Sequence, residues 1–544
     1  MGTIGVILFM LTAVVASGVL VRAIPLAIPT PLVQIALGAA IAAGSDHRVE
    51  LDPEVFFFLF LPPLLFLDGW RIPKDGLLRD RGMILELAFG LVIFTVLGMG
   101  LFIHWLIPAI PYAVAFALSA IVSPTDPVAV SAISARIPIP PRVMHVLEGE
   151  SLLNDASGLV CFRFAVAAAM TGVFSLPAAT LTFAKLLVLG IFVGVALTLL
   201  VMAAKAWLAR KLGEDSGSQV LVSLLIPFAA YELAEQFGGS GILAAVAAGI
   251  TMSYAELSGR ALASTRVQRT AVWDTVQFAL NGIMFVLLGE QLPSIFSGAL
   301  EVVQQSDHVN PWWLAVYAIA INFGLAALRF AWVGVSVRVT YFIAQRRGEA
   351  LARRPGWRLI AAVSVAGVRG AITLAGVLTL PLVLADGSAF PARDLTIFLA
   401  AAVIILSLTA ASLLLPHLVE GLHLPSESAG DEELDRARAT AAKAAIRAVE
   451  EASHEMASGH SDADIYADAA TRVMDTYRRR LEGHLKGENA MRARRANSVE
   501  RKLRLAALRA ERETLYELVR RKRISDEKSR QLMRELDLVE ERLS

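Results

Sequence analysis

Long apolar runs separated by short polar connections fill the chain as far as about residue 425. A helix needs roughly 20 apolar residues to cross the hydrocarbon core of a membrane. Thirteen runs approach that length, and they begin near residues 3, 28, 54, 83, 111, 148, 181, 218, 240, 270, 312, 359 and 395. No Lys or Arg precedes the first run, which is typical of a retained span rather than a cleaved signal peptide. The pattern predicts an all-α polytopic membrane protein with 13 transmembrane helices.

Charge divides the chain into two regions. The whole chain of 544 residues is 56% hydrophobic. Nevertheless, residues 426–544 hold 49 of its 99 charged side chains. We therefore expect a transmembrane domain over 1–425 and a charged, helical cytoplasmic tail over 426–544. The net charge of +1 argues against a nucleic-acid partner. Because Cys161 is the one cysteine, no intrachain disulfide can form.

Basic residues lie in every second connection between the spans. The odd-numbered connections hold 19 Lys and Arg, and the even-numbered ones hold only Arg48 and Arg393. Basic connections stay in the cytoplasm. We therefore predict a multi-pass protein of the cell membrane with its amino terminus outside and its tail in the cytoplasm.

Polar residues interrupt the third and fifth spans. Ionisable groups are costly in a membrane, so they are functional candidates. The third span, "FFFLFLPPLLFLDGW", has Asp68 near its end after a Pro-Pro break; a carboxylate at the membrane surface is the alternative interpretation. In the fifth, "FALSAIVSPTDPVAVSAIS", Pro124 and Pro127 flank Thr125–Asp126. The two prolines predict an unwound segment with free carbonyls that lines a cavity. A simple kink would leave Asp126 unexplained.

The sixth span begins with "GESLLNDASG". On a helix, one face would carry Ser151, Asn154, Asp155 and Gly158. Glu150 would point about 100° away from Ser151, toward a different neighbour. Gly158 would let a neighbouring backbone come close to the Asp155 face.

The twelfth span, "LIAAVSVAGVRGAITLAGVLTLPLVLA", has Arg369 between Gly367 and Gly370. A guanidinium inside a membrane needs an anionic partner, and Glu150 is the natural candidate. Snorkelling or structural hydrogen bonding accounts better for the other intramembrane polar residues, which are Arg163, Asn322 and Arg329.

The two interrupted spans, the fifth and the twelfth, are seven apart, and an odd offset gives them opposite orientations. Inverted repeats with paired broken helices mark a transporter site at the membrane midplane. The oxygens available there suit a small hard cation: those of Asp155, Asp126 and Ser151 and the carbonyl of Thr125. A carboxylate removed from water also takes up a proton more readily, so cation and proton would compete for Asp155. With Asn154 beside it instead of a second carboxylate, one cation would exchange for one proton.

The motifs also carry a resemblance. "FLPPLLFLD", "SPTDPVAV", "GESLLNDAS", "GGSGILAAVAAGI" and "GVRGAI" follow the order seen in the cation:proton antiporter-1 family, which includes NhaP-like bacterial proteins and animal sodium/proton exchangers. The resemblance covers most of the membrane domain. It implies a homodimer whose protomers each have a dimerisation subdomain and a six-helix core with crossed, discontinuous helices. It also implies an elevator mechanism.

The resemblance implies a role for each site residue. Asp155 would bind the cation or the proton, and Asn154 would be its partner in the pair that marks the electroneutral branch. The rest of the ion site would come from Asp126, Ser151, the Thr125 carbonyl and the nearby Asp68. Glu150 and Arg369 would form a buried structural ion pair. No cofactor is expected besides the transported cation and H⁺.

The sequence therefore predicts a secondary antiporter that exchanges Na⁺, and also Li⁺, for H⁺, in the service of pH homeostasis. The alternatives are a K⁺/H⁺ antiporter on the same scaffold and a cation channel without proton coupling. A membrane hydrolase using Ser151 fails, because "GES" is not followed by the second glycine of a nucleophile elbow.

The pattern of charged and apolar residues in the tail predicts two amphipathic helices joined near "RISDE". A helical hairpin packed on the dimer mate is the plainer interpretation, and a regulatory or pH-sensing contact is the alternative. Membrane lipids are a further expected partner, since the basic cluster "RRKR", 520–523, could touch anionic lipid.

Overall fold

The computed structural model describes residues 3–23, 28–44, 53–72, 74, 81–126, 141–172, 176–213, 215–256, 263–304, 310–347, 356–384, 387–420, 428–457, 463–483, 488–521, 523–524 and 526–543. The regular structure in these ranges is helical, apart from an isolated β-bridge between Val383 and Ala389. The chain divides into two compact units, Met1–Leu422 and His423–Ser544.

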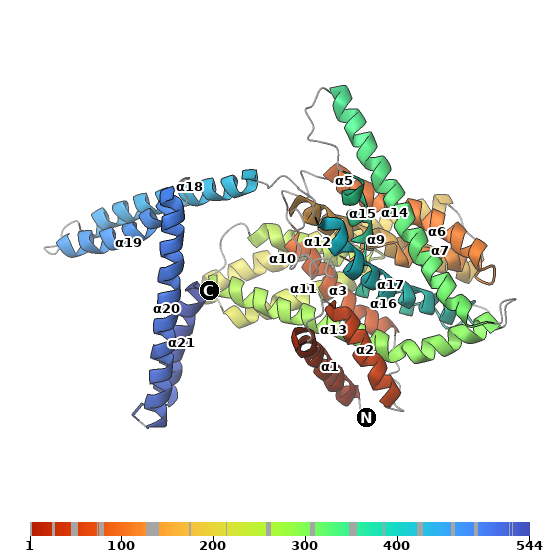
Figure 1. The fold of residues 1–544 in the computed structure, drawn as a ribbon, viewed down its shortest axis with the longest axis horizontal. Coiled ribbons are helices and arrows are strands. Elements are labelled where there is room, and N and C mark those ends of the chain that lie inside the picture. The colour runs from red at the N-terminus through yellow and green to blue at the C-terminus, as the bar shows by residue number, and fades with distance from the viewer. Residues whose placement is uncertain are drawn as a thin grey trace. The chain divides into compact units, whose positions relative to one another are not determined.

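The first unit is a bundle of apolar helices (Figure 1). Its elements are α1 (Thr3–Ala23), α2 (Thr30–Gly44), α3 (Pro53–Arg71), α5 (Arg81–Leu85), the π-helix η1 (Glu86–Leu91), α6 (Val92–Leu106), α7 (Tyr112–Val122), α9 (Pro141–Thr171), α10 (Leu176–Leu212), α11 (Ser216–Gln236), α12 (Gly241–Glu256), α13 (Ala263–Gln304), α14 (Trp312–Arg347), α15 (Trp357–Val365), α16 (Ala371–Leu378) and α17 (Arg393–Val419). By length and composition, 7 helical stretches in the described residues could cross a membrane, and shorter apolar helices accompany them. The chain is therefore a multi-pass membrane protein, while the count of 13 spans stays a prediction.

Helix α3 runs without a break through Pro62 and Pro63, so the predicted Pro-Pro break is wrong. The prolines remove two backbone donors from the helix. Leu61 and Leu65 beside them are inaccessible to solvent, because neighbouring helices enclose this part of α3. Tertiary packing thus holds a helical backbone that local propensity opposes.

Facing glycines bring two pairs of helices to backbone contact. A Cβ on Gly249 of α12 would overlap the Phe66 carbonyl of α3, and one on Gly69 of α3 would crowd the Val246 carbonyl of α12. Gly38 of α2 and Gly289 of α13 meet in the same way. Small residues at such crossings allow close packing of membrane helices. They place α3, which carries Asp68, firmly against α12.

Two helices end abruptly inside the bundle. Helix α7 ends at Val122, and residues 123–126 are not helical; Pro127 lies outside the described residues. The twelfth predicted span is interrupted between α15 and α16. The Asp126 N–H donates to the Val368 carbonyl at 2.7 Å, so the two non-helical segments are joined backbone to backbone.

The second unit contains four helices: α18 (Ser428–Ala457), α19 (Ala463–Gly483), α20 (Glu488–Arg520) and α21 (Asp526–Leu543). Helix α18 packs on α19, and α20 packs on α21 (Figure 1). Arg512 of α20 joins the second pair, since it donates to Asp537 at 2.7 Å and also to Glu540.

Candidate cation site at the broken helices

Helix α9 lies against the end of α7 at the centre of the candidate site. A Cβ on Gly158 would overlap the Pro124 ring and lie 3.0 Å from the Ala120 carbonyl. The predicted close approach of a neighbouring backbone at Gly158 is therefore confirmed. It sets the non-helical segment 123–126 beside the polar face of α9.

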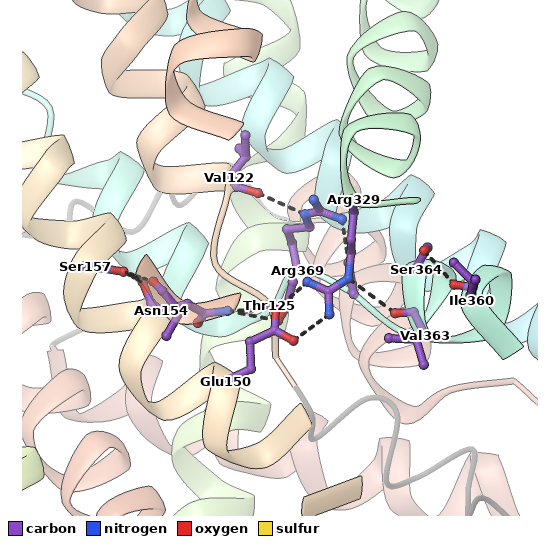
Figure 2. Close-up of polar contacts among 12 residues, drawn as sticks. Val122, Thr125, Glu150, Asn154, Ser157, Arg329, Ile360, Val363, Ser364 and Arg369 are labelled. Atoms are coloured by element: carbon purple, nitrogen blue, oxygen red, sulfur yellow. Dashed lines mark hydrogen bonds and ion pairs between the residues drawn. The ribbon is translucent and has the colours of Figure 1, made fainter. Parts of the chain in front are cut away.

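Glu150 is paired with Arg329 of α14, not with Arg369 (Figure 2). Its Oε2 accepts from Arg329 Nη2 at 2.7 Å, and its Oε1 accepts from Nη1. Both residues are buried, with Glu150 at 0% and Arg329 at 3% exposure. Arg329 Nε also donates to the Val363 carbonyl at 3.3 Å. The predicted Glu150–Arg369 ion pair is wrong, and Arg329, to which the sequence assigned snorkelling or a structural hydrogen bond, is the partner.

Arg369 instead binds carbonyls that the broken helices leave free. Its Nε donates to the Val122 carbonyl at 2.9 Å, at the last residue of α7 (Figure 2). Its Nη1 donates to the Gly367 carbonyl. Its backbone N–H donates to Ser407 Oγ of α17 at 3.2 Å. The last carbonyls of a helix lack intrahelical donors, and they carry the negative end of the helix dipole. The buried guanidinium of Arg369 is therefore satisfied by backbone oxygens rather than by a carboxylate.

Thr125 and Asn154 connect the ion pair to the non-helical segment. Asn154 Nδ2 donates to Thr125 Oγ1 at 3.1 Å and lies 3.5 Å from Glu150 Oε1 (Figure 2). Thr125 Oγ1 lies 3.4 Å from the same Glu150 oxygen. Asn154 Oδ1 is buried and has no hydrogen-bond partner within the described part of the chain. The Asn154 side-chain NH₂ group thus faces Thr125 and the Glu150–Arg329 pair, and its Oδ1 stays available as an acceptor.

Three carboxylates form the acidic part of the site, and one of them, Asp126, belongs to this non-helical segment. Asp155 is only 4% exposed and lies within electrostatic range of Asp68 and Asp126, which also interact with each other. Among the described residues, Asp155 has neither a hydrogen bond nor an ion pair through its carboxylate. A Cβ on Gly370 would overlap the Asp126 carboxylate, so the glycine before α16 makes room for this acid.

Seen together, the predicted site residues fall into two groups. The ion-pair group joins Thr125 and Asn154 to Glu150, and the acidic group holds Asp155, Asp126 and Asp68. Ser151 is buried on α9 at 3% exposure. Within the described residues, no three Asp, Glu, His or Cys side chains converge closely enough to hold a metal ion. A cation here would need hydroxyl, amide or backbone oxygens besides the carboxylates.

Comparison with known proteins decides the family. The family model described as sodium/hydrogen exchanger, transmembrane, matches residues 9–421. The chain belongs to the sodium/hydrogen exchanger family. An Escherichia coli K12 protein described as an uncharacterized Na⁺/H⁺ exchanger, YjcE, is 40% identical over 541 residues, which cover 98% of this chain and 97% of the relative. A Bacillus subtilis protein named sodium, potassium, lithium and rubidium/H⁺ antiporter is 38% identical over 540 residues, covering 98% of this chain and 77% of the relative.

The fold is that of a solved antiporter. The structure of the sodium proton antiporter MjNhaP1 from Methanocaldococcus jannaschii at pH 8 matches with a TM-score of 0.55. The match covers 78% of this chain and 99% of that one, at 17% identity, and shows the fold alone.

The structure of this exchanger adds two site neighbours that the sequence analysis missed. Glu148 lies within electrostatic range of Asp68. It precedes Asp155 by seven positions, which on a helix is the same face, so spacing alone would have found it. The other is the Ala88 carbonyl in η1, which accepts from Ser157 Oγ at 2.7 Å. π-helical turns occur frequently at functional sites, but no sequence pattern marked this one.

Proposed function

We propose that this exchanger carries a monovalent cation, Na⁺ and also Li⁺, in one direction and H⁺ in the other across the cell membrane. The observation that carries the proposal is Asp155, which is buried beside Asp68 and Asp126 with no basic partner among the described residues. A charged carboxylate in low dielectric beside like charges is unfavourable. Either a bound cation or a bound proton removes that cost.

Exchange follows because the two ligands exclude each other at Asp155. A proton on the carboxylate removes the negative charge that holds the cation, and a bound cation disfavours the proton. If the site opens to one side at a time, each passage carries one ligand or the other. With Asn154 beside Asp155, one cation for one proton is the stoichiometry we propose, and the exchange is electroneutral. The remaining cation oxygens would come from Asp126, Ser151 and the Thr125 carbonyl.

K⁺ is the second candidate cation. The Bacillus subtilis relative carries sodium, potassium, lithium and rubidium in its name. The described site contains no closely converging cage of acids that would select a small ion by size. A site completed by neutral oxygens suits several monovalent cations, so K⁺ belongs in every transport assay.

Inverted repeats are supported by duplicated contacts. A seven-span offset relates α1, α2, α3 and α9 to α11, α12, α13 and α17. Helix α2 packs on α13 and α12 packs on α3; likewise α1 packs on α13 and α11 packs on α3. The pairs α3 with α9 and α13 with α17 correspond too, as do α9 with α12 and α17 with α2. The facing glycines obey the same correspondence. Gly38 of α2 corresponds to Gly249 of α12, and Gly289 of α13 corresponds to Gly69 of α3.

From these duplicated contacts we propose that the membrane unit consists of two parts that move relative to each other. The transport core comprises α5, η1, α6, α7, α9 and α14–α17, with the two broken helices crossing in it, and the scaffold comprises α1–α3 and α10–α13. Elevator-type movement of the core against the scaffold would expose Asp155 alternately to each side. The scaffold would form the homodimer, with membrane lipids around it. The amino terminus would lie outside and the tail in the cytoplasm, where the tail would pack on the dimer mate or on a regulator.

Proteoliposomes with an imposed pH gradient test the function. Addition of Na⁺, Li⁺ or K⁺ should dissipate the gradient, with the apparent KM rising as protons compete for Asp155. If none of the three cations changes the gradient, the protein is not a cation/proton antiporter. Cation flux without proton movement would identify a channel. A rate that follows an imposed membrane potential would contradict electroneutral exchange.

A further inference from the structure

An ion pair joins the ion-binding helix to the scaffold at a distance from the candidate site. Arg163 follows Asp155 by eight residues on α9, about 12 Å along the helix axis. Its Nη1 lies 3.1 Å from Oε1 and 3.5 Å from Oε2 of Glu235, one residue before α11 ends at Gln236. Arg163 belongs to the transport core, and Glu235 belongs to the scaffold.

The scaffold side of this pair is preformed. Glu235 Oε1 also accepts from the Gly241 N–H at 3.0 Å, at the first residue of α12. A carboxylate at a helix amino terminus is stabilised by the free N–H groups and the helix dipole. The Tyr231 ring packs on Gly241 and lies within electrostatic range of both charges. Glu235 is therefore held by the connection between α11 and α12, and Arg163 reaches it from the neighbouring helix.

We infer that the Arg163–Glu235 pair is a positioning contact of the transport cycle, which holds α9 against the α11–α12 connection in one of the two access states. The inference rests on the proposed function, since it requires α9 to move against the scaffold. The connection between α11 and α12 is the eighth, which the basic-residue pattern puts outside. The pair therefore holds the core and the scaffold together on the outer side, and it must separate for the site to open outward.

The size of the effect follows from exposure. The two side chains are 38% and 34% exposed, so water screens the attraction. Such pairs shift an equilibrium by about two- to fivefold. The pair sets the balance between inward-open and outward-open states without locking either one.

Sided transport kinetics test the pair. Arg163→Gln should favour the outward-open state. The apparent KM for Na⁺ then rises in inside-out vesicles, where the cytoplasmic face is accessible, and falls in right-side-out vesicles, each by about two- to fivefold. Arg163→Lys keeps the charge and should restore most of the wild-type values. Glu235→Gln keeps an acceptor for Gly241 and should reproduce Arg163→Gln.

Glu540→Gln is the matched control, because it breaks a pair of similar exposure, Arg512–Glu540, within the tail helices α20 and α21. It should leave both KM values unchanged. If Arg163→Gln and Glu235→Gln change neither KM, or raise both together, the inference is wrong while the proposed antiport stands. A wild-type protein that shows no cation-driven proton movement would instead overturn the proposed function.

Discussion

Helix α9 carries two buried carboxylates with opposite surroundings. Glu150 is inaccessible, and both of its oxygens accept from Arg329. Asp155 is nearly as buried, but its charged neighbours are Asp68 and Asp126. The sequence separation is five residues, which turns the two side chains toward different partners. Burial is thus common to both acids, and the sign of the neighbouring charge differs.

The difference assigns the two acids to different tasks. A buried carboxylate with a bidentate guanidinium is already neutralised, and losing either partner leaves an isolated buried charge. A buried carboxylate among like charges is neutralised only when a cation or proton arrives. Glu150 therefore has a structural role, and Asp155 takes part in the transport cycle.

The largest expected effect is that of Asp155→Asn. The amide cannot exchange a proton or attract a cation, so cation-driven proton movement in proteoliposomes should fall to the background of empty liposomes. Thermal unfolding should stay close to that of the wild type, because Asp155 has no hydrogen bond to lose among the described residues. Asp215→Asn makes the same change at the exposed start of α11 and should exchange normally. An Asp155→Asn protein that still exchanges cations for protons would show that Asp155 is not the acid that binds the cation and the proton in turn.

Breaking the structural pair should lower stability more than cation affinity. Glu150→Ala or Arg329→Ala should each cost about 3–5 kcal/mol of unfolding free energy, because each leaves a buried charge without its partner. The double variant should lose less than the sum. Denaturant unfolding in detergent measures all three.

The same measurement sharpens the assignment of the pair. A double-mutant cycle between Glu150 and Arg369 should give a smaller coupling than the one between Glu150 and Arg329, since Arg369 binds carbonyls. Equal or reversed couplings would restore Arg369 as the partner.

Gly370→Ala should damage the acidic side of the site. The added methyl group would overlap the Asp126 carboxylate, and overpacking of this kind costs about 1–3 kcal/mol. We expect a higher KM for Na⁺ and a lower rate of exchange, since the Asp126 carboxylate must leave its present position beside Gly370. Gly334→Ala is the control, because no atom lies within 4 Å of an added Cβ there. Equal kinetics in the two variants would mean that the position of Asp126 is unimportant.

Glu148→Gln should have the smallest effect. Glu148 is partly buried and acts on Asp68 through charge alone, so its removal should weaken cation attraction by about 0.5–1 kcal/mol. The KM for Na⁺ should rise about two- to fivefold at low ionic strength and less in high salt. Glu148→Asp should retain most of the affinity. A change in KM that salt does not reduce would point to a direct contact with the cation instead.

The sequence alone determined features that depend on local pattern. Apolar runs predicted membrane helices, and the proline and glycine positions predicted where the fifth and twelfth spans lose helical structure. Helical periodicity separated Glu150 from Asp155 and put Gly158 at a close approach. These predictions succeeded because helix geometry relates residues within a few turns without reference to the rest of the chain.

Only the tertiary structure decided which distant groups meet. From the sequence we predicted a Glu150–Arg369 pair, because only charged side chains were considered as partners for Arg369. The carbonyls that two broken helices leave free also accept from a guanidinium. Arg329, 179 residues from Glu150, became the partner once α14 packed near α9. The same packing holds Pro62 and Pro63 in a continuous helix against their local preference. Partner choice depends on how helices pack, and the burial of many side chains together outweighs what any short stretch prefers.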